Sequence, residues 1–583
     1  MTSPRRLAAA LQGALTLATL GCASPEPTEH ATPAGPADLV LRGAAVYTMD
    51  AARSWAEAVA IRDGRIVFVG AEADLDPHLA PGTRQVRLDG GMVLPGFHDA
   101  HVHPAAGGVE LLLCDLNGST SAEEVAERIR RYAAAHPDRE WITGGGFDLP
   151  LFEAGSPRRE LLDELVPDRP TYLTSSDGHS AWVNSRALEI AGVDAATPDP
   201  PAGRIDRDRA TGEPSGTLRE TAMAMVGRHA PPITAEQMTD GLRRGLEMAS
   251  RYGITSLVEA SASDAIADAY RTLAAAGELP VRAVLSLSWE GVAEQADAIA
   301  ALAERRERLA APRLRADAVK LFADGVIEAG TAALLEPYEE TEDDRGEATY
   351  EDDELRAIVG DLDAAGFQVH IHAIGDAAIR SSLDALEAAA RDNPPRLRRH
   401  HLAHIQLVAP ADQPRFRELG VFANIQPLWA YADPFITELT EPRLGAERSR
   451  WLYPFASLRA HGAKLAAGSD WSVSSMNPLE AMQVAVTRQA PGAGGPPVWL
   501  PDERLDLPAI LAAYTIQGAA LMGHERETGS IEVGKAADLV VLDRNLFELA
   551  PREIGSAKVR ATLLAGGVVW SDREWGGPGA AQR

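Results

Sequence analysis

The sequence contains few cysteines, fewer basic than acidic residues, and no array of long apolar runs. Lys and Arg number 56 against 84 Asp and Glu, and the net charge of −28 repels phosphate backbones and anionic lipids. We therefore expect no nucleic-acid partner. Hydrophobic residues at 45% and charged residues at 24% are ordinary for a globular protein, so neither a disordered chain nor a multi-span membrane protein is indicated.

The N-terminus is typical of an export signal. Arg5 and Arg6 precede the apolar run LAAALQGALTLATLG, which is short for a membrane span and ends at Cys22 in a lipoprotein-like box. We expect residues 1–22 to be a lipoprotein signal with Cys22 acylated, and residues 23–37 to be a flexible tether. An ordinary cleaved signal peptide, or the twin-arginine route, stays open. The predicted location is the cell envelope, or otherwise the exterior. Acylation of Cys22 would leave Cys114 without a disulfide partner in the mature chain.

Both ends of the globular part have strand-like patterns. Segments such as DLVLRGAAVYTMD and EAVAIRDGRIVFVG alternate apolar and polar residues between turn residues, and GSIEVGKAADLVVLDRN does the same near the other end. We predict that residues 38–94 and 526–572 combine into one small β-sandwich domain, followed by a tail at 573–583.

The middle of the chain predicts an α/β fold of the (β/α)₈ TIM-barrel type over residues 95–525. Eight apolar runs alternate with helix-like stretches: FHDAHVH, GITSLVEAS, VRAVLSLSW, ADAVKLFADG, FQVHIHAIGD, RHHLAHIQL, GVFANIQP and AKLAAGSDW. About 130 residues separate the first two runs, which is too long for a loop. We predict a subdomain inserted after the first strand, at about residues 105–236.

Histidines lie at the carboxyl ends of several of these strands, which is where the functional residues of a TIM barrel are located. His101 and His103 are two positions apart, so on an extended strand both imidazoles face the same side. His372 and His404 end later strands and offer the neutral nitrogen donors that zinc prefers. Each of these histidines alone could instead be a buried structural residue. Together they predict a site for one or two divalent metal ions, with zinc favoured.

Two other polar residues lie at the same predicted rim. An ammonium at Lys320 is costly among apolar neighbours unless it is paired or modified, so we consider an ion pair with Asp324 and a carbamate that bridges two metal ions. Asp470, after the last strand, is the candidate general acid and base, which would take a proton from metal-activated water and deliver it to the leaving nitrogen. Its structural alternative is a helix N-cap.

These motifs together resemble the amidohydrolase superfamily. DGHSAWVNSRAL, HAIGDAAI, ANIQPLW, LAAGSDW and GSIEVGKAADLVVLD are similar to the branch of YtcJ-like proteins and N-substituted formamide deformylases, and the match covers nearly the whole mature chain. The resemblance implies a metal-dependent hydrolase of amide or related C–N bonds and favours carbamylation of Lys320. The ligand positions that it implies are His101, His103, Lys320, His372 and His404, with Asp470 as acid and base. In RRHHLAHIQ, His401 competes with His404 for the ligand position.

The substrate is less determined. We expect a small molecule, with Phe147, His179 and Trp429 as candidate contacts, while Trp182 is expected to be packing and Arg219 with Glu220 a surface ion pair. A deaminase of the same superfamily and a non-catalytic envelope binding protein are the rival functions. Contact with the membrane is expected only through a lipid on Cys22, and a homo-oligomer stays open.

Overall fold

The computed structural model describes residues 35–291, 295–339, 341–492, 497–572 and 575. The predicted signal segment with Cys22, most of the tether and all but one residue of the tail lie outside these residues. Within the part that is described, no helix is both long and apolar enough to cross a membrane.

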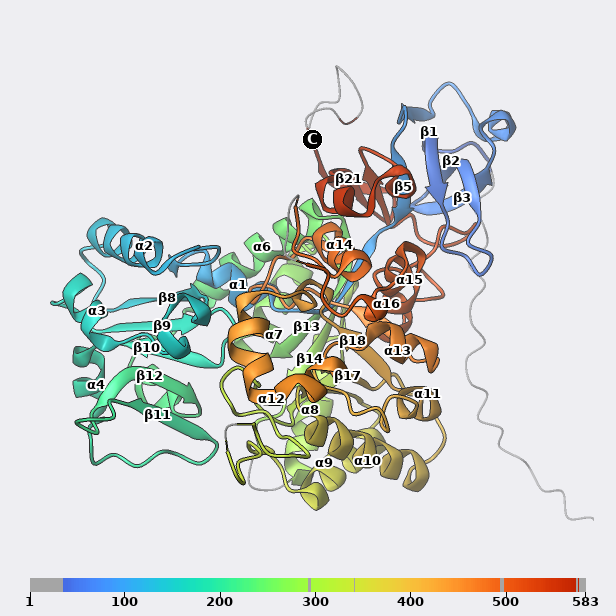
Figure 1. The fold of residues 1–583 in the computed structure, drawn as a ribbon. Coiled ribbons are helices and arrows are strands. Elements are labelled where there is room, and N and C mark those ends of the chain that lie inside the picture. The colour runs from blue at the N-terminus through green and yellow to red at the C-terminus, as the bar shows by residue number, and fades with distance from the viewer. Residues whose placement is uncertain (1–34, 292–294, 340, 493–496, 573–574, 576–583) are drawn as a thin grey trace, which may run out of the picture.

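The central body is a barrel of eight parallel strands (Figure 1). Backbone hydrogen bonds from Asp470 N to His101 O (2.7 Å) and from His103 N to Trp471 O (2.9 Å) join the last strand connection to the first strand and so bring the two edges together. The predicted TIM-barrel class is confirmed. The strands are β6 (Phe97–Val102), β13 (Ile254–Ala262), β14 (Arg282–Ser288), β15 (Leu314–Phe322), β16 (Gln368–Ala373), β17 (His401–His404), β18 (Phe422–Ile425) and β19 (Lys464–Ala467).

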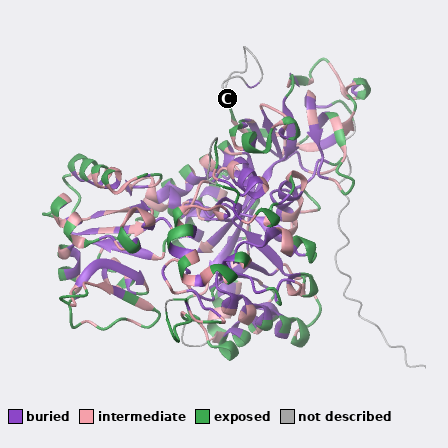
Figure 2. Ribbon diagram, in the orientation of Figure 1, coloured by how far each residue is buried: buried purple, intermediate pink, exposed green. Residues whose placement is uncertain are grey.

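Helices cover the outside of the barrel, which explains why its strands are apolar on both faces. Buried residues concentrate in the strands, while the outer faces of the surrounding helices are exposed (Figure 2). The helices around the barrel include α6 (Ala235–Arg251), α7 (Asp264–Ala276), α8 (Gln295–Leu309), α9 (Asp352–Ala364), α10 (Asp376–Asp392), α11 (Arg415–Leu419), α12 (Glu441–Arg448), α13 (Phe455–Ala460), α14 (Pro478–Thr487), α15 (Leu507–Ala513) and α16 (Ile516–Met522).

A separate six-stranded sheet is inserted between the first two barrel strands and lies beside the barrel, at the left of Figure 1. Its spatial order is β11-β12-β10-β9-β8-β7. The strands are β7 (Cys114–Asp115), β8 (Ile142–Phe147), β9 (Thr171–Ser175), β10 (Ser180–Val183), β11 (Gly203–Arg207) and β12 (Pro214–Glu220), with helices α2 (Ala122–Ala135), α3 (Arg159–Leu165), α4 (Ser185–Ala191) and α5 (Met223–Gly227).

The two ends of the globular chain share one β domain. Strands from both ends, which we expected to form a sandwich, are hydrogen-bonded into one eight-stranded sheet in which β5 pairs with β20 in antiparallel fashion. This pairing joins the segment that leads into the barrel to the segment that leaves it. The strands are β1 (Leu39–Tyr47), β2 (Trp55–Arg62), β3 (Arg65–Gly70), β4 (Arg84–Arg87), β5 (Met92–Pro95), β20 (Leu539–Leu542), β21 (Val559–Leu564) and β22 (Gly567–Ser571).

Glycines place the helix that follows the first barrel strand. Helix α1 (Pro104–Glu110) begins directly after His103 and packs on α6. A Cβ at Gly108 would lie 1.8 Å from the carbonyl oxygen of Gly241, and one at Gly245 would lie 2.2 Å from that of Pro104. Only residues without a Cβ allow the two backbones this close, and the contact fixes where His103 leaves the strand.

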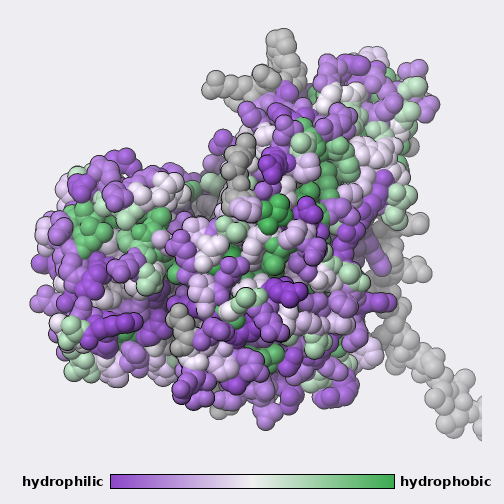
Figure 3. Space-filling model, in the orientation of Figure 1, coloured by the Kyte–Doolittle hydropathy of each residue, from purple (hydrophilic) through white to green (hydrophobic). Residues whose placement is uncertain are grey.

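The surface drawn in Figure 3 is mostly hydrophilic, with hydrophobic side chains in small separate areas over the inserted sheet and the barrel. Scattered apolar residues of this kind are normal on a soluble surface.

Candidate metal centre

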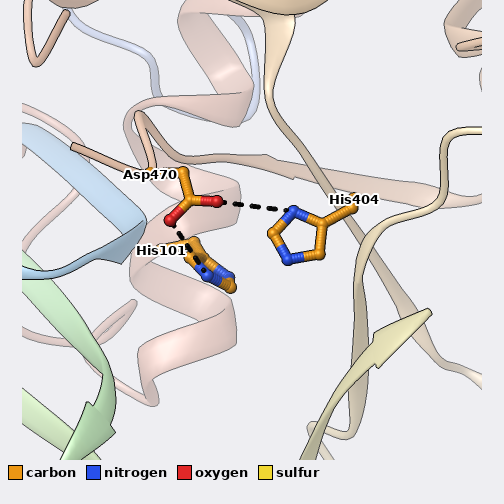
Figure 4. Close-up of side chains that lie close together, drawn as sticks. All are labelled: His101, His404 and Asp470. Atoms are coloured by element: carbon orange, nitrogen blue, oxygen red, sulfur yellow. Dashed lines mark ion pairs between the residues drawn. The ribbon is translucent and has the colours of Figure 1, made fainter. Parts of the chain in front are cut away.

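Three buried side chains from three parts of the barrel meet at one point (Figure 4). Asp470 lies between two imidazoles, with its Oδ1 3.5 Å from His101 Nε2 and its Oδ2 3.6 Å from His404 Nδ1. One ligand atom from each of the three residues falls within 4.8 Å of the others. Within the described residues, no other group of three such side chains is this compact. The spacing suits one ion held by two nitrogens and a carboxylate oxygen.

The donor atoms also have the chemistry that a cation requires. Asp470 Oδ1 is buried, and its ion-pair contacts are imidazole nitrogens, His103 Nε2 at 3.1 Å and His101 Nε2 at 3.5 Å; a buried carboxylate is costly unless a positive charge meets it. Burial, together with the nearby Lys320 and His404, holds the pKa of His101 well below its usual value, so its imidazole is neutral and able to coordinate. The residues present therefore fit a divalent metal ion.

A chain of hydrogen bonds fixes the orientation of His101. Its Nδ1 lies 3.0 Å from His370 Nε2, and His370 Nδ1 lies 2.9 Å from the hydroxyl of Ser286. These contacts occupy His101 Nδ1 and leave Nε2 directed at Asp470. His370 therefore supports His101 from behind and fixes the direction of its ring.

His103 lies between two carboxylates. Its Nε2 is 3.1 Å from Asp470 Oδ1 and its Nδ1 is 3.7 Å from Glu259 Oε1. Glu259 is fully buried on β13, and neither of its oxygens has a hydrogen-bond partner within 3.5 Å. Sequence reasoning missed Glu259, although its position in the second predicted strand, GITSLVEAS, was a usable signal.

Asp99 is a second buried acid that sequence reasoning missed. Its Oδ1 accepts hydrogen bonds from the backbone N–H of His101 (3.2 Å) and of Ser469 (3.0 Å). It thereby links the strand that carries the two histidines to the loop that carries Asp470. Burial raises the pKa of Asp99 to about 7.

The backbone is strained at two of the meeting residues. His404 has φ 73° and Asp470 has φ 52°, both in the left-handed region that non-glycine residues seldom adopt. Such conformations persist where the surrounding structure enforces them, and they concentrate at functional sites. The helix after Asp470, α14, is capped by Asn477, so the alternative interpretation of Asp470 as an N-cap is wrong.

His372 occupies the neighbouring strand end. Its ring centroid is 4.6 Å from that of His404, and its Nε2 donates to the carbonyl oxygen of Gly325 at 3.0 Å. That hydrogen bond leaves Nδ1 with the lone pair. Asp324 accepts three backbone N–H groups, those of Ala333, Ile374 and Gly375, and so holds this loop against β16.

Lys320 is buried at the same rim. Its Nζ lies 4.7 Å over the ring of Phe322, and within the described part of the chain no carboxylate is within ion-pair distance of it. The alternative of an ion pair with Asp324 is therefore wrong, because backbone donors occupy that acid. Burial, only partly opposed by Asp470, lowers the pKa of Lys320 to about 7.

The neighbouring histidines His400 and His401 make contacts away from Asp470. His400 Nε2 contacts Asp363 Oδ1 at 3.1 Å, and His400 Nδ1 accepts from Val369 N, so this histidine braces the barrel exterior. His401 lies next to His370 with 4.1 Å between ring centroids, and its Nδ1 is 3.2 Å from Arg399 O. Of the two competing histidines, His404 is the one that reaches Asp470.

The candidate substrate contacts separate into two groups. Trp429 stacks on His404, with 5.5 Å between ring centroids and 10° between planes, and His179 lies with its ring 5.4 Å from that of His372. Phe147 is fully buried and packs against Trp182 in the core of the inserted sheet. A ring without exposed surface has no face left for a substrate, so the prediction for Phe147 is wrong.

The predicted surface pair of Arg219 and Glu220 is also wrong. Adjacent residues on a strand point to opposite faces. Arg219 is buried and bonds Asp206 at 2.9 Å, whereas Glu220 accepts a hydrogen bond from His179 Nδ1 at 2.9 Å. The inserted sheet thus presents a His–Glu pair to the barrel.

Known proteins match this chain over nearly its whole length. The sequence profile of the Amidohydrolase family matches residues 85–570. Protein LONG AFTER FAR-RED 3 of Arabidopsis thaliana is 32% identical over 91% of this chain and 91% of its own length. N-substituted formamide deformylase of Arthrobacter pascens is 30% identical over 91% of this chain and 97% of its own. A crystal structure of an uncharacterized metal-dependent hydrolase from Pyrococcus furiosus, 26% identical, superposes with a TM-score of 0.67 and covers 88% of this chain and 99% of that one.

Proposed function

This chain belongs to the amidohydrolase family and is a metal-dependent hydrolase of C–N bonds, and from that premise we propose that it hydrolyses small N-acyl or N-formyl amines with Asp470 as general acid and base. The resemblance predicted from sequence is thereby confirmed. The observation that carries the proposal is the buried carboxylate of Asp470, whose oxygens face the imidazole nitrogens of His101, His103 and His404.

The residues that would hold the metal are His101, His103, His372, His404 and Asp470, with Lys320 as a further ligand if two ions bind. Zinc suits this nitrogen-rich set. When bound, a divalent ion lowers the pKa of water to about 7 and polarises the carbonyl group that is attacked. The deformylase name of one relative makes N-formyl amines the first substrates to examine.

Asp470 would move the proton. Its carboxylate takes a proton from the attacking water and delivers it to the amide nitrogen as the C–N bond breaks, which leaves the acid ionised for the next cycle. His101 and His103 hold the carboxylate from one side, and the left-handed backbone at Asp470 aims it into the barrel. Trp429, stacked on His404, would form an apolar wall for the substituent on nitrogen.

Lys320 would carry a carbamate. A pKa of about 7 leaves a large fraction of the side chain as free amine near neutral pH. The amine nitrogen forms a bond to the carbon of CO₂ and releases one proton, and the carbamate that results has two oxygens to offer. Intact-mass measurement after fast, mild preparation tests for the added CO₂.

The test of function is metal content combined with turnover. We expect one to two equivalents of transition metal by elemental analysis, lost in the double variant His101→Ala, His103→Ala. Asp470→Asn should lower kcat on a panel of N-formyl and N-acetyl amines, including formanilide, by about 10² to 10⁴. Asp502→Asn, at an exposed position, is the matched control. A metal-free active enzyme, or undiminished turnover in Asp470→Asn, would contradict the proposal.

We also propose export with a lipid on Cys22, supported by the lipoprotein-like box that ends at this residue. Acylation would tether the enzyme to the cell envelope. Replacing Cys22 with Ala should move the protein from the membrane fraction to the soluble fraction. Unchanged fractionation would contradict the lipid anchor.

A further inference from the structure

The inserted sheet places a histidine and a glutamate at the mouth of the barrel. His179 immediately precedes β10, and Glu220 ends β12, the neighbouring strand. Both Glu220 oxygens are near His179 Nδ1, at 3.1 and 2.9 Å, so this nitrogen donates to the carboxylate. The side chains are only 16% and 19% exposed. The pair is therefore held inside the junction between the insert and the barrel.

The barrel holds the other side of Glu220. Thr331, in the loop after β15, donates its hydroxyl to Glu220 Oε1 at 2.9 Å and accepts from Val326 N at 2.9 Å. Gly325 makes room for this contact, because a Cβ there would lie 2.8 Å from Glu220 Oε1 and 2.2 Å from Thr331 Oγ1. Glu220 itself has φ 50°, a left-handed conformation that is unfavourable for a non-glycine residue and persists only where its surroundings enforce it. A strained, doubly held carboxylate is more than an incidental surface contact.

The same loop connects the pair to the candidate metal centre. Gly325, whose missing Cβ admits Glu220, accepts the hydrogen bond from His372 Nε2 through its carbonyl oxygen at 3.0 Å. The His179 ring lies 5.4 Å from the His372 ring, centroid to centroid. Among the described residues, nothing forms a hydrogen bond to His179 Nε2. This nitrogen is thus the free polar group that the insert brings to the centre.

We propose that His179 binds the amide group of the substrate through Nε2 and that Glu220, braced by Thr331, is the residue that positions it. The inference rests on the proposed amide hydrolysis and adds the source of substrate orientation. It gives the inserted sheet a role in the site: a substrate is held between the metal centre in the barrel and a histidine from the insert.

The first experiment measures kcat and KM on formanilide with the metal-loaded enzyme. His179→Phe should lower kcat/KM by about 10- to 100-fold, and Glu220→Gln by about tenfold, with metal content unchanged. His179→Gln, which keeps a hydrogen-bonding end, should recover part of the loss. His229→Phe, at an exposed histidine of the same insert, is the control and should match the native enzyme. A His179→Phe enzyme within twofold of native, or no advantage of Gln over Phe, would overturn the inference.

A second experiment distinguishes the donor from the acceptor role of Nε2. N-methylformanilide has no amide N–H. If Nε2 donates to the carbonyl oxygen, His179→Phe weakens turnover of both compounds; if Nε2 accepts the N–H, only formanilide is affected. Both results support a contact with the amide group. Equal turnover of both compounds by native enzyme and His179→Phe would overturn it.

A third experiment does not depend on turnover. Calorimetric binding of formanilide is compared in Asp470→Asn and in Asp470→Asn combined with His179→Phe, where we expect about tenfold weaker binding in the second. If native enzyme hydrolyses no member of the panel, the proposed function fails. The inference on His179 is then still decided by binding: equal affinities, or no binding to either protein, would overturn it.

Discussion

Loading zinc into the metal-free chain should release about one proton at pH 7, and that proton should come from His103. Burial alone would lower the pKa of His103, but the carboxylates of Asp470 and Glu259 on either side of its ring outweigh burial and raise the pKa to about 9. Burial instead holds the pKa values of His101 and His404 well below the usual range, so these imidazoles are already neutral. His103 is therefore the ligand that must lose a proton before it can coordinate.

The size of the effect follows from the difference between the assay pH and this pKa. At pH 7, two units below a pKa of about 9, roughly one His103 side chain in 100 is unprotonated. Zinc should then bind about 100-fold more weakly than above pH 9, which corresponds to about 3 kcal/mol. Because the pKa is raised, the proton competes with the metal below pH 9. The affinity should rise about tenfold per pH unit towards about pH 9 and level off there.

The assay is competitive zinc titration of chelator-stripped protein in metal buffers across this pH range, with proton release measured by calorimetry in two buffers of different ionisation enthalpy. Glu259→Gln removes one of the two carboxylates beside His103, so the plateau should begin at a lower pH. Glu278→Gln, at an exposed glutamate, should leave the curve unchanged. A zinc affinity that is constant between pH 7 and pH 9, or binding without proton release, would refute the reasoning.

Three other predictions concern stability and ligand identity. Asp363→Asn should lower the free energy of unfolding by about 3–5 kcal/mol at pH 7 in urea titrations, because this buried acid bonds Arg398, at 2.8 Å, among other donors. These bonds outweigh burial and hold the pKa of Asp363 well below its usual range. The difference in the free energy of unfolding between Asp363→Asn and the native chain should therefore shrink as the pH falls below about 4. A difference that does not change with pH would contradict this. Gly245→Val should lower the melting temperature by forcing α1 and α6 apart, at a cost of about 1–3 kcal/mol, whereas an unchanged temperature would show that the helices can separate freely. His404→Ala should lose metal by elemental analysis while His401→Ala keeps it, and the reverse result would exchange their roles.

The barrel and the polar residues at the ends of its strands could be predicted, because local sequence patterns indicate both. The run FQVHIHAIGD predicts a strand followed by a turn, and β16 (Gln368–Ala373) lies within it. Parallel barrel strands all end at one face, so residues as distant as His101 and Asp470 could be expected together without knowledge of their contacts. Apolar periodicity and topology were sufficient for that step.

Side-chain partners could not be predicted in the same way. Glu259 and Asp99 look like ordinary strand residues in the sequence, and their unpaired or shared oxygens become visible only when neighbouring strands are placed beside them. Phe147 was predicted at the substrate site, but the inserted sheet buries its ring in the core of the insert. The sequence could not show this, because long-range packing sets the orientation of that sheet.

The sequence alone determined the fold class, the metal-type chemistry of the rim and the existence of an insert, because these follow from residue type, spacing and the common direction of barrel strands. The tertiary structure decided which groups touch. Arg219 and Glu220 are neighbours in the chain but lie on opposite faces of β12, so one pairs within the insert and the other with His179 at the barrel mouth. Hydrogen bonds act over about 3 Å, a distance that only the closed barrel and the docked insert establish.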